Sequence, residues 1–311
     1  MERVCVVGAG VIGGLYAAHL ARVAEVSVLT RREEHARALV EQGLRVSGKS
    51  DFVASVFATA RVEELPDFEL GILATKATEL EEAGARLEGR FPDATLMTVQ
   101  NGLGAEEIVR RFGEWPIVSA VTFMSGTRHE DAHVEYVLDT DTWLGPYEGT
   151  PPETVQAVAN LLARSGLKAL ALDDVRPARW SKLIFNATVN GVAALTRLPH
   201  DAHFADRETE WALGHLVHGL IEEGKRIAGA VGISLHDDPW EMNVLATRRG
   251  SAHYPSMLED VEARLPTELE LINGSLVREA RRAGVDAPQQ EAIYALVQAK
   301  ESSYLRTPVT P

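Results

Sequence analysis

The sequence is poor in cysteine, because Cys5 is the only one among 311 residues. A single thiol excludes both a disulfide framework and any metal site built from several cysteines. Long apolar runs are also missing: none approaches the roughly 18 residues that a membrane-spanning helix needs. The first residues lack the basic start and apolar stretch of a signal peptide. We therefore expect a cytoplasmic protein that does not enter a membrane.

Positive charge is in short supply as well. The 31 Lys and Arg residues face 45 Asp and Glu residues, so the formal net charge is −14. Because nucleic acids and anionic membranes attract basic surfaces, this balance argues against either as a partner. The hydrophobic content of 45 % and the charged content of 24 % are ordinary for a globular protein. At roughly 150 residues per domain, the length indicates about two domains.

A glycine motif stands near the start of the chain, between an apolar strand at residues 4–7 and helical spacing at residues 15–22. In this context the first glycine allows a tight turn, the second lets a pyrophosphate approach, and the third lets helix and strand pack closely. The helix N-terminus then offers N–H groups to the phosphates. The alternative is a glycine-rich turn without a ligand. The predicted dinucleotide-binding residues are Gly8, Ala9, Gly10, Val11, Ile12 and Gly13.

The next strand, expected at residues 25–29, ends in Thr30, Arg31 and Arg32. NAD-binding proteins usually place an acid there for the ribose 2′-hydroxyl. An arginine binds a 2′-phosphate through charge-assisted hydrogen bonds, so Arg31 favours NADP(H). Alternatively, both arginines are solvated and pair with Glu33 and Glu34.

Two further buried strands, expected at residues 70–74 and 95–99, are followed by Lys76 and Asn101. Ligands of open α/β sheets bind at the carboxyl ends of strands, so both residues are candidate ligand contacts. The alternatives are a solvated loop for Lys76 and a plain turn for Asn101. More strands are expected at residues 117–123, 133–137 and 142–144, with an antiparallel sheet edge.

Strand patterns largely stop after residue 172, and a helical pattern begins at Pro177. Asp173 and Asp174 fit a helix cap at a domain junction. The predicted fold is therefore α/β. A Rossmann-type doubly wound sheet occupies residues 1–173, and an all-helical domain occupies residues 174–311.

The helical half contains a polar stripe. Lys182, Asn186 and Asn190 are four residues apart, so they share one face of a helix with apolar flanks. Because buried polar groups need partners, a cleft with a polar ligand would satisfy them. A solvent-facing stripe is the alternative. Ser256 and Glu268 fit a helix cap and an acidic first turn, so spacing alone assigns them structural roles.

Together these motifs resemble the ketopantoate reductase (2-dehydropantoate 2-reductase) family along nearly the whole chain. The matching segments are, in order, Gly8-x-Gly10-x-x-Gly13, Arg31, Lys76, Asn101-Gly102-x-Gly104, Lys182-x-x-x-Asn186-x-x-x-Asn190, Ser256-Met257-Leu258, Thr267-Glu268, Ile272-Asn273-Gly274 and Lys300-Glu301. The resemblance implies a Rossmann domain and a helical domain, with NADPH and a small 2-oxo acid bound between them and no metal.

The resemblance also implies roles for single residues. The glycine motif would hold the pyrophosphate, and Arg31 and Lys76 the 2′-phosphate side of NADPH. Asn101 would lie beside the cofactor ribose and the substrate. In the helical half, Lys182 would be the general acid, with Glu268 close to it. The residues expected to bind the substrate's carboxylate and hydroxyl are Asn186, Asn190 and Ser256.

The activity that this family implies is reduction of 2-dehydropantoate to pantoate in pantothenate biosynthesis. Residues 122–127 and 236–250 depart from the family pattern, and both could border the substrate. A reductase for another 2-oxo acid is therefore an alternative, as is a β-hydroxyacid or opine-type dehydrogenase. An NADPH-sensing binding protein without catalysis is a third. The sequence leaves a homodimer open.

Overall fold

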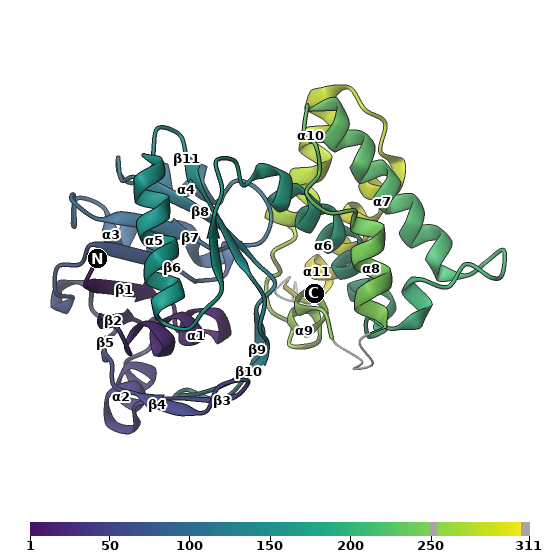
Figure 1. Cartoon of the computed structure of the whole chain (residues 1–311). Coiled ribbons are helices and arrows are strands. Elements are labelled where there is room, and N and C mark those ends of the chain that lie inside the picture. The colour runs from purple at the N-terminus through teal and green to yellow at the C-terminus, as the bar shows by residue number, and fades with distance from the viewer. Residues whose placement is uncertain (249–253, 306–311) are drawn as a thin grey trace, which may run out of the picture. The chain divides into compact units, whose positions relative to one another are not determined.

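The computed structural model describes residues 1–248 and 254–305. The chain forms two compact units, and Figure 1 labels their elements. The first unit comprises Met1–Gln100 and Ala105–Val175. The second comprises Asn101–Gly104 and the chain from Arg176 onward. The sequence-based division at residue 173 did not separate out the short loop at residues 101–104, which packs with the helical unit.

The first unit is built on an eight-stranded sheet with the order β12-β11-β8-β7-β6-β1-β2-β5. Six strands are parallel, and their order of 3-2-1-4-5-6 within this sheet is that of a dinucleotide-binding fold. The edge is antiparallel, because β11 runs against β8. These findings confirm the predicted α/β sheet. Its strands are Arg3–Val7 (β1), Glu25–Leu29 (β2), Phe57–Thr59 (β5), Leu70–Leu73 (β6), Thr95–Thr98 (β7), Ile117–Thr122 (β8), Thr142–Tyr147 (β11) and Ala169–Ala171 (β12).

A smaller sheet of four strands, in the order β4-β3-β10-β9, also belongs to the first unit. It was not expected, and it corrects the placement of residues 133–137, which the sequence analysis assigned to the edge of the main sheet. That segment pairs instead with β3, which is far from it in sequence, and with β9, which directly precedes it. The strands are Leu44–Gly48 (β3), Phe52–Ala54 (β4), Ser125–Glu130 (β9) and His133–Leu138 (β10).

Helices connect the strands of the first unit. Helix α1 has no polar face, because it packs against strands of both sheets, and Leu15, Tyr16 and Leu20 are fully buried. Helix α5 packs on β11 and β12 and buries its apolar side chains, among them Val155, Val158 and Leu162. The helices are Val11–Leu20 (α1), Glu33–Gln42 (α2), Leu80–Leu87 (α3), Ala105–Arg110 (α4) and Pro152–Arg164 (α5), with short 3₁₀ turns at Val62–Glu64 (η1) and Ala77–Glu79 (η2).

The regular elements of the second unit are all helices among the residues that the structure describes, as predicted. Helix α6 packs against α7, α8, α9 and α11, and most of its apolar side chains are buried. One turn, η4, is a π-helix rather than an α-helix. The elements are Arg176–Thr196 (α6), Ala202–Phe204 (η3), Leu213–Ala230 (α7), Pro239–Thr247 (α8), Ser256–Glu262 (α9), Glu270–Gly274 (η4), Ser275–Ala283 (α10) and Pro288–Leu305 (α11).

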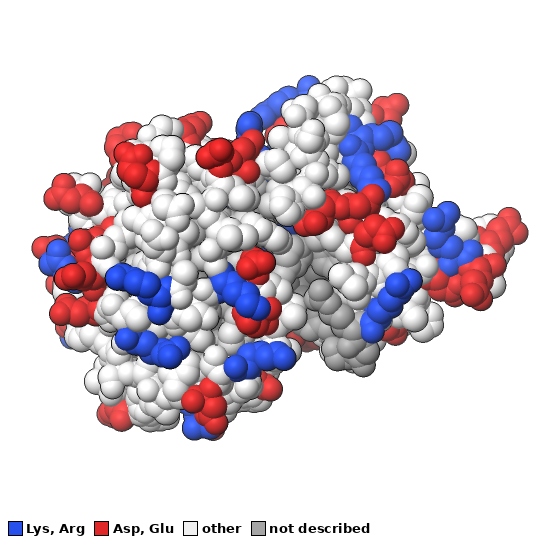
Figure 2. Space-filling view, in the orientation of Figure 1, with Lys and Arg blue, Asp and Glu red and all other residues white. Residues whose placement is uncertain are grey.

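Charged side chains of both signs lie on the surface. Figure 2 shows acidic and basic side chains interspersed over the visible face. Within the described part of the chain, no helix combines the length and apolarity needed to cross a bilayer.

Candidate active site

The glycine motif forms the turn between β1 and α1. Gly8 has a φ of +92°, a left-handed conformation that favours glycine. A Cβ atom on Gly13 would lie 1.8 Å from the Gly8 carbonyl oxygen, so only glycine fits there. At Gly10, apart from the residue itself and its immediate neighbours in the chain, no atom of the described residues lies within 4 Å of the position that a Cβ would occupy. The backbone is therefore open to a ligand at the N-terminus of α1, where the first turn contains no acid. These features fit a pyrophosphate.

The unusual segment at residues 122–127 packs beside this turn. A Cβ atom on Gly126 in β9 would lie 3.0 Å from a methyl carbon of Val11 and 2.2 Å from the Glu135 carbonyl oxygen. The hydroxyl of Thr122 accepts a hydrogen bond from the Met124 amide over 3.0 Å. The segment thus supports the glycine turn from the second sheet, a contact that the sequence analysis did not anticipate.

Arg31 lies after β2, with a side chain 66 % exposed, and forms an ion pair with Glu79. Its neighbour Arg32 pairs with Asp131 over 2.6 Å. The alternative interpretation of the sequence paired these two arginines with Glu33 and Glu34, but their partners are Glu79 and Asp131. Because exposed ion pairs contribute little stability, Arg31 can exchange its partner for a phosphate at small cost.

Lys76 is exposed and immediately precedes η2, the turn that carries Glu79. The Glu79 amide donates to the Lys76 carbonyl oxygen over 3.0 Å. The ion pair between Glu79 and Arg31 thus joins this turn to the end of β2. Both cations predicted to bind a 2′-phosphate lie in this part of the first unit.

The polar stripe of the second unit lies on α6. Lys182 and Asn186 are half-buried, and Asn190 is buried with 5 % exposure. The stripe is therefore not a solvated face. The apolar residues beside it, among them Leu183, Ile184 and Val189, belong to the core of the helical unit.

A set of amide and carboxylate contacts joins α6 to two other segments of the second unit. The side-chain amide of Asn101 donates to the Glu268 carboxylate over 3.0 Å. The side-chain amide of Asn186 donates to the Asn101 side-chain oxygen over 3.5 Å. Asn101, which follows a strand of the first unit in sequence, thus lies between the helix with Lys182 and the segment with Glu268.

The sequence suggested that Glu268 occupies the first turn of an α-helix, but the structure places it elsewhere. It lies just before the π-helical turn η4. The Ile272 amide of that turn donates a hydrogen bond to the Glu268 carbonyl oxygen over 3.1 Å. The same turn anchors the loop of Asn101, because the Leu103 amide donates to the Leu271 carbonyl oxygen over 2.9 Å. A Cβ atom on Gly102 would lie 1.8 Å from that oxygen, so the loop requires glycine.

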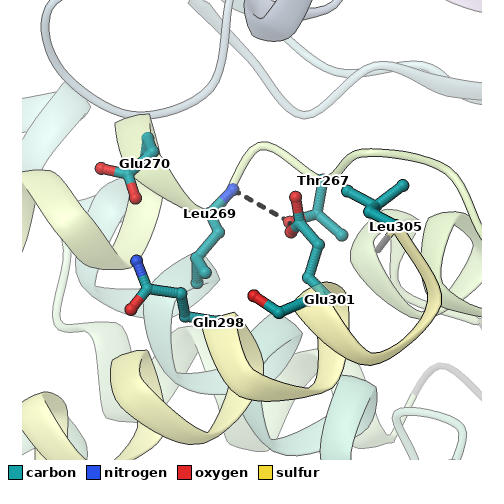
Figure 3. A pocket seen from close by; sticks show the side chains of 7 residues that line it. Thr267, Leu269, Glu270, Gln298, Glu301 and Leu305 are labelled. Carbon is teal, nitrogen blue, oxygen red and sulfur yellow. Dashed lines mark hydrogen bonds between the residues drawn. The ribbon is translucent and has the colours of Figure 1, made fainter. Parts of the chain in front are cut away.

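Thr267 fixes the chain on the other side of Glu268. Its hydroxyl donates a hydrogen bond to the Glu301 carboxylate over 2.6 Å. The same hydroxyl accepts a hydrogen bond from the Leu269 amide over 3.2 Å (Figure 3). A pocket of about 280 Å³ opens here. Because the carboxyl groups of Glu270 and Glu301 line it, this pocket is unsuited to an acidic substrate.

The charge state of Lys182 reflects three influences. Burial lowers the pKa of its ammonium group to about 8, the Glu268 carboxylate opposes that change, and the Arg179 guanidinium adds to it. The group can therefore give up or take a proton near neutral pH. A lysine with such a pKa, under the influence of a carboxylate, is suited to general acid–base chemistry.

Ser256 is the first residue of α9 and is exposed. It is not the helix cap that the sequence suggested, because that position belongs to Pro255. Within the described residues, neither Ser256 nor Asn190 shares a hydrogen bond with Lys182, Asn186 or Glu268. Helix α9 itself packs against α6.

The segment at residues 236–250 contains α8, and residues 249 and 250 lie outside the described chain. The Asp238 side chain caps this helix by accepting from the Trp240 amide over 2.7 Å. Asn243 is fully buried and is hydrogen-bonded to the His200 ring over 2.9 Å and to the Phe204 carbonyl oxygen over 3.0 Å. The only signal of these buried hydrogen bonds in the sequence is an asparagine among the apolar residues of this helix.

Family models and known proteins agree with one another. A model described as "Ketopantoate reductase PanE/ApbA" matches residues 4–149, and one for the C-terminal part matches residues 174–301. The chain is 29 % identical over 301 residues to a 2-dehydropantoate 2-reductase of Pyrococcus horikoshii, covering 96 % of this chain and 98 % of that protein. It is 26 % identical to the enzyme of the same name from Archaeoglobus fulgidus, covering 97 % and 99 %.

Solved structures show the same fold. The crystal structure of 2-dehydropantoate 2-reductase from Methylococcus capsulatus superposes with a TM-score of 0.86 at 27 % identity, covering 99 % of this chain and all of that one. A D-mandelate dehydrogenase with NADH and anilino(oxo)acetate superposes with a TM-score of 0.88 at 23 % identity, covering 97 % and 99 %.

We expect Lys182 to titrate near pH 8 and the Glu268→Gln variant to lower that value, because it removes the charge that favours the ammonium form. Competitive labelling of lysines with acetic anhydride across pH, read by mass spectrometry, measures the pKa directly. Glu270→Gln is the matched control, since Glu270 pairs with Arg278 and Tyr294. An unchanged pKa of Lys182 in Glu268→Gln would contradict the electrostatic coupling.

Proposed function

The chain belongs to the ketopantoate reductase family, and from that premise we propose that it reduces 2-dehydropantoate to pantoate with NADPH. Enzymes of this family are oxidoreductases that act on CH–OH groups and reduce 2-oxo acids. The observation that carries the proposal is the grouping of Lys182, Glu268, Asn101 and Asn186 in the helical unit. That grouping combines an acid–base lysine with neutral hydrogen-bonding groups.

The first unit fits the cofactor of the family, NADPH. The turn from Gly8 to Gly13 would hold its pyrophosphate on the N-terminus of α1. Arg31 and Lys76 would bind its 2′-phosphate, with Arg31 exchanging Glu79 for the phosphate. When bound, the cofactor supplies the hydride for the carbonyl carbon of the substrate.

Lys182 would act on the ketone oxygen. Negative charge grows on this oxygen during reduction, and an ammonium group beside it stabilises that charge and donates the proton. Burial works against the ammonium form, whereas Glu268 favours it. Glu268 would therefore keep enough Lys182 protonated for catalysis at neutral pH, and Asn101 would orient Glu268 through its amide.

The remaining polar residues would recognise the rest of the substrate. The amides of Asn186 and Asn190 on α6 would bind the carboxylate and hydroxyl, and the exposed hydroxyl of Ser256 would add a further contact. Neutral amides suit this task because they bind a carboxylate without a second fixed charge that would shift the pKa of Lys182.

We expect the protein to oxidise NADPH, read at 340 nm, fastest with 2-dehydropantoate among a panel of 2-oxo acids. Lys182→Ala should lose at least about 100-fold in kcat while its Kd for NADPH stays unchanged, since general acids typically contribute that much or more. Faster turnover of another 2-oxo acid would support the proposed reductase activity but would show that 2-dehydropantoate is not the preferred substrate. Turnover of no ketone despite NADPH binding would favour a binding protein, and unchanged turnover in Lys182→Ala would remove Lys182 as the acid.

The rate of 2-oxo acid reduction should fall at high pH. Because the pKa of Lys182 is about 8, its ammonium form predominates below pH 8 and disappears above it. We therefore expect kcat/KM for the 2-oxo acid, at saturating NADPH, to be level at low pH. Above pH 8 it should fall by about tenfold for each pH unit. A rate that stays level from pH 7 to pH 10 would exclude Lys182 as the proton donor.

Arg31→Ala should raise the Kd for NADPH by about tenfold or more and leave the Kd for NADH nearly unchanged, because only NADPH has the 2′-phosphate. Calorimetry or fluorescence titration with both cofactors measures the two effects. Arg282→Ala serves as the control, since Arg282 is an exposed, paired arginine of the helical unit. Equal losses for both cofactors would argue against the 2′-phosphate contact.

A further inference from the structure

Asn273 is a fully buried polar residue that the proposed chemistry does not use. It lies in the π-helical turn η4, and its side-chain amide donates to the Ala187 carbonyl oxygen on α6 over 2.7 Å. Its side-chain oxygen is buried without a hydrogen-bond partner in the described residues. Because an unpaired buried polar atom costs folding free energy, stability alone does not account for an amide at this position.

The contact of Asn273 joins the two segments that carry the charged pair. Ala187 follows Asn186 directly and lies just over one helical turn beyond Lys182 on α6. The turn that contains Asn273 is hydrogen-bonded to the backbone around Glu268. The Ile272 amide donates to the Glu268 carbonyl oxygen over 3.1 Å, and the Gly274 amide donates to the Leu269 carbonyl oxygen over 2.9 Å.

The surrounding packing leaves the amide little freedom. A Cβ atom on Gly191 would lie 2.4 Å from a methyl carbon of Ile293 and 3.3 Å from the side-chain nitrogen of Asn273. Glycine at this position of α6 therefore lets the π-helical turn approach closely. Ile272 and Leu276, near neighbours of Asn273 in the chain, are buried in the core of the helical unit.

We propose that Asn273 is a positioning residue, whose amide holds the π-helical turn that follows Glu268 against the helix that carries Lys182. It touches neither substrate nor cofactor in this proposal and acts through Glu268. The inference rests on the proposed role of Lys182 as the acid, and it adds the device that sets the distance between the two charges. The π-helical geometry is consistent with this, because such turns occur frequently at functional sites.

The decisive variant is Asn273→Ala, which removes the amide without adding bulk. Because Glu268 would no longer be held beside α6, the pKa of Lys182 should fall by about half a unit or more below its value in the unaltered protein. The kcat for 2-oxo acid reduction should fall by about tenfold, and the Kd for NADPH should not change. Acetic anhydride labelling of Lys182 and the pH profile of kcat/KM measure the shift independently.

Gln290→Ala is a matched control for the loss of a buried amide. Gln290 is also fully buried, donates to one helical carbonyl, that of Leu220, over 3.0 Å, and has an unpaired side-chain oxygen. It joins α11 to α7 rather than η4 to α6. Gln290→Ala should therefore lower the Tm to a similar degree while leaving the pKa of Lys182 and the pH profile unchanged.

The outcomes separate this inference from the proposed function. A lower pKa of Lys182 in Asn273→Ala but not in Gln290→Ala supports positioning. An unchanged or raised pKa in Asn273→Ala overturns it, whatever the loss of Tm. The labelling readout needs no substrate, so it decides the positioning even if the unaltered protein reduces no 2-oxo acid. If Asn273→Ala fails to fold, Asn273→Ser replaces it and is judged by the same two values.

Discussion

The candidate site depends on one turn of backbone, the π-helix at Glu270–Gly274. Its carbonyl at Leu271 holds the loop of Asn101, and its side chain at Asn273 holds helix α6. Its first backbone bond is to Glu268. Three segments that are far apart in sequence therefore meet at a turn with π-helical rather than α-helical bonding. A regular helix there would rotate these groups relative to one another and separate their contacts.

The balance of charge around Lys182 follows from that arrangement. Burial works against its ammonium form, and Arg179 on the same helix adds to this effect. The Glu268 carboxylate is the opposing influence, so its position decides how far the pKa of Lys182 falls. Neutral amides at Asn101 and Asn186 provide hydrogen bonds without changing this balance of charge. The pKa of Lys182 is therefore sensitive to the contacts that hold the Glu268 segment, among them the hydrogen bond from Asn101.

Much of the fold followed from local patterns. The strands predicted from apolar runs, the helix after the glycine motif and the start of the helical half lie within a few residues of the observed elements. The second sheet was missed because β4 has only three residues and β9 is largely exposed, so neither has a clear apolar pattern. Its pairing of β3 with β10 joins residues far apart in sequence, which no local pattern reveals. The same holds for the ion pair of Arg31 with Glu79.

The sequence by itself determined which candidate groups the chain carries: a glycine turn that fits a pyrophosphate, an arginine where NAD-binding proteins usually have an acid, and a lysine with two asparagines on one helical face. Periodicity and residue type suffice for such statements because each depends on neighbours within one element. Only the tertiary structure decided that the loop of Asn101 belongs with the helical unit and that Glu268 precedes a π-helical turn. It alone placed Asn273 against α6, because hydrogen bonds between distant segments depend on how the whole chain packs.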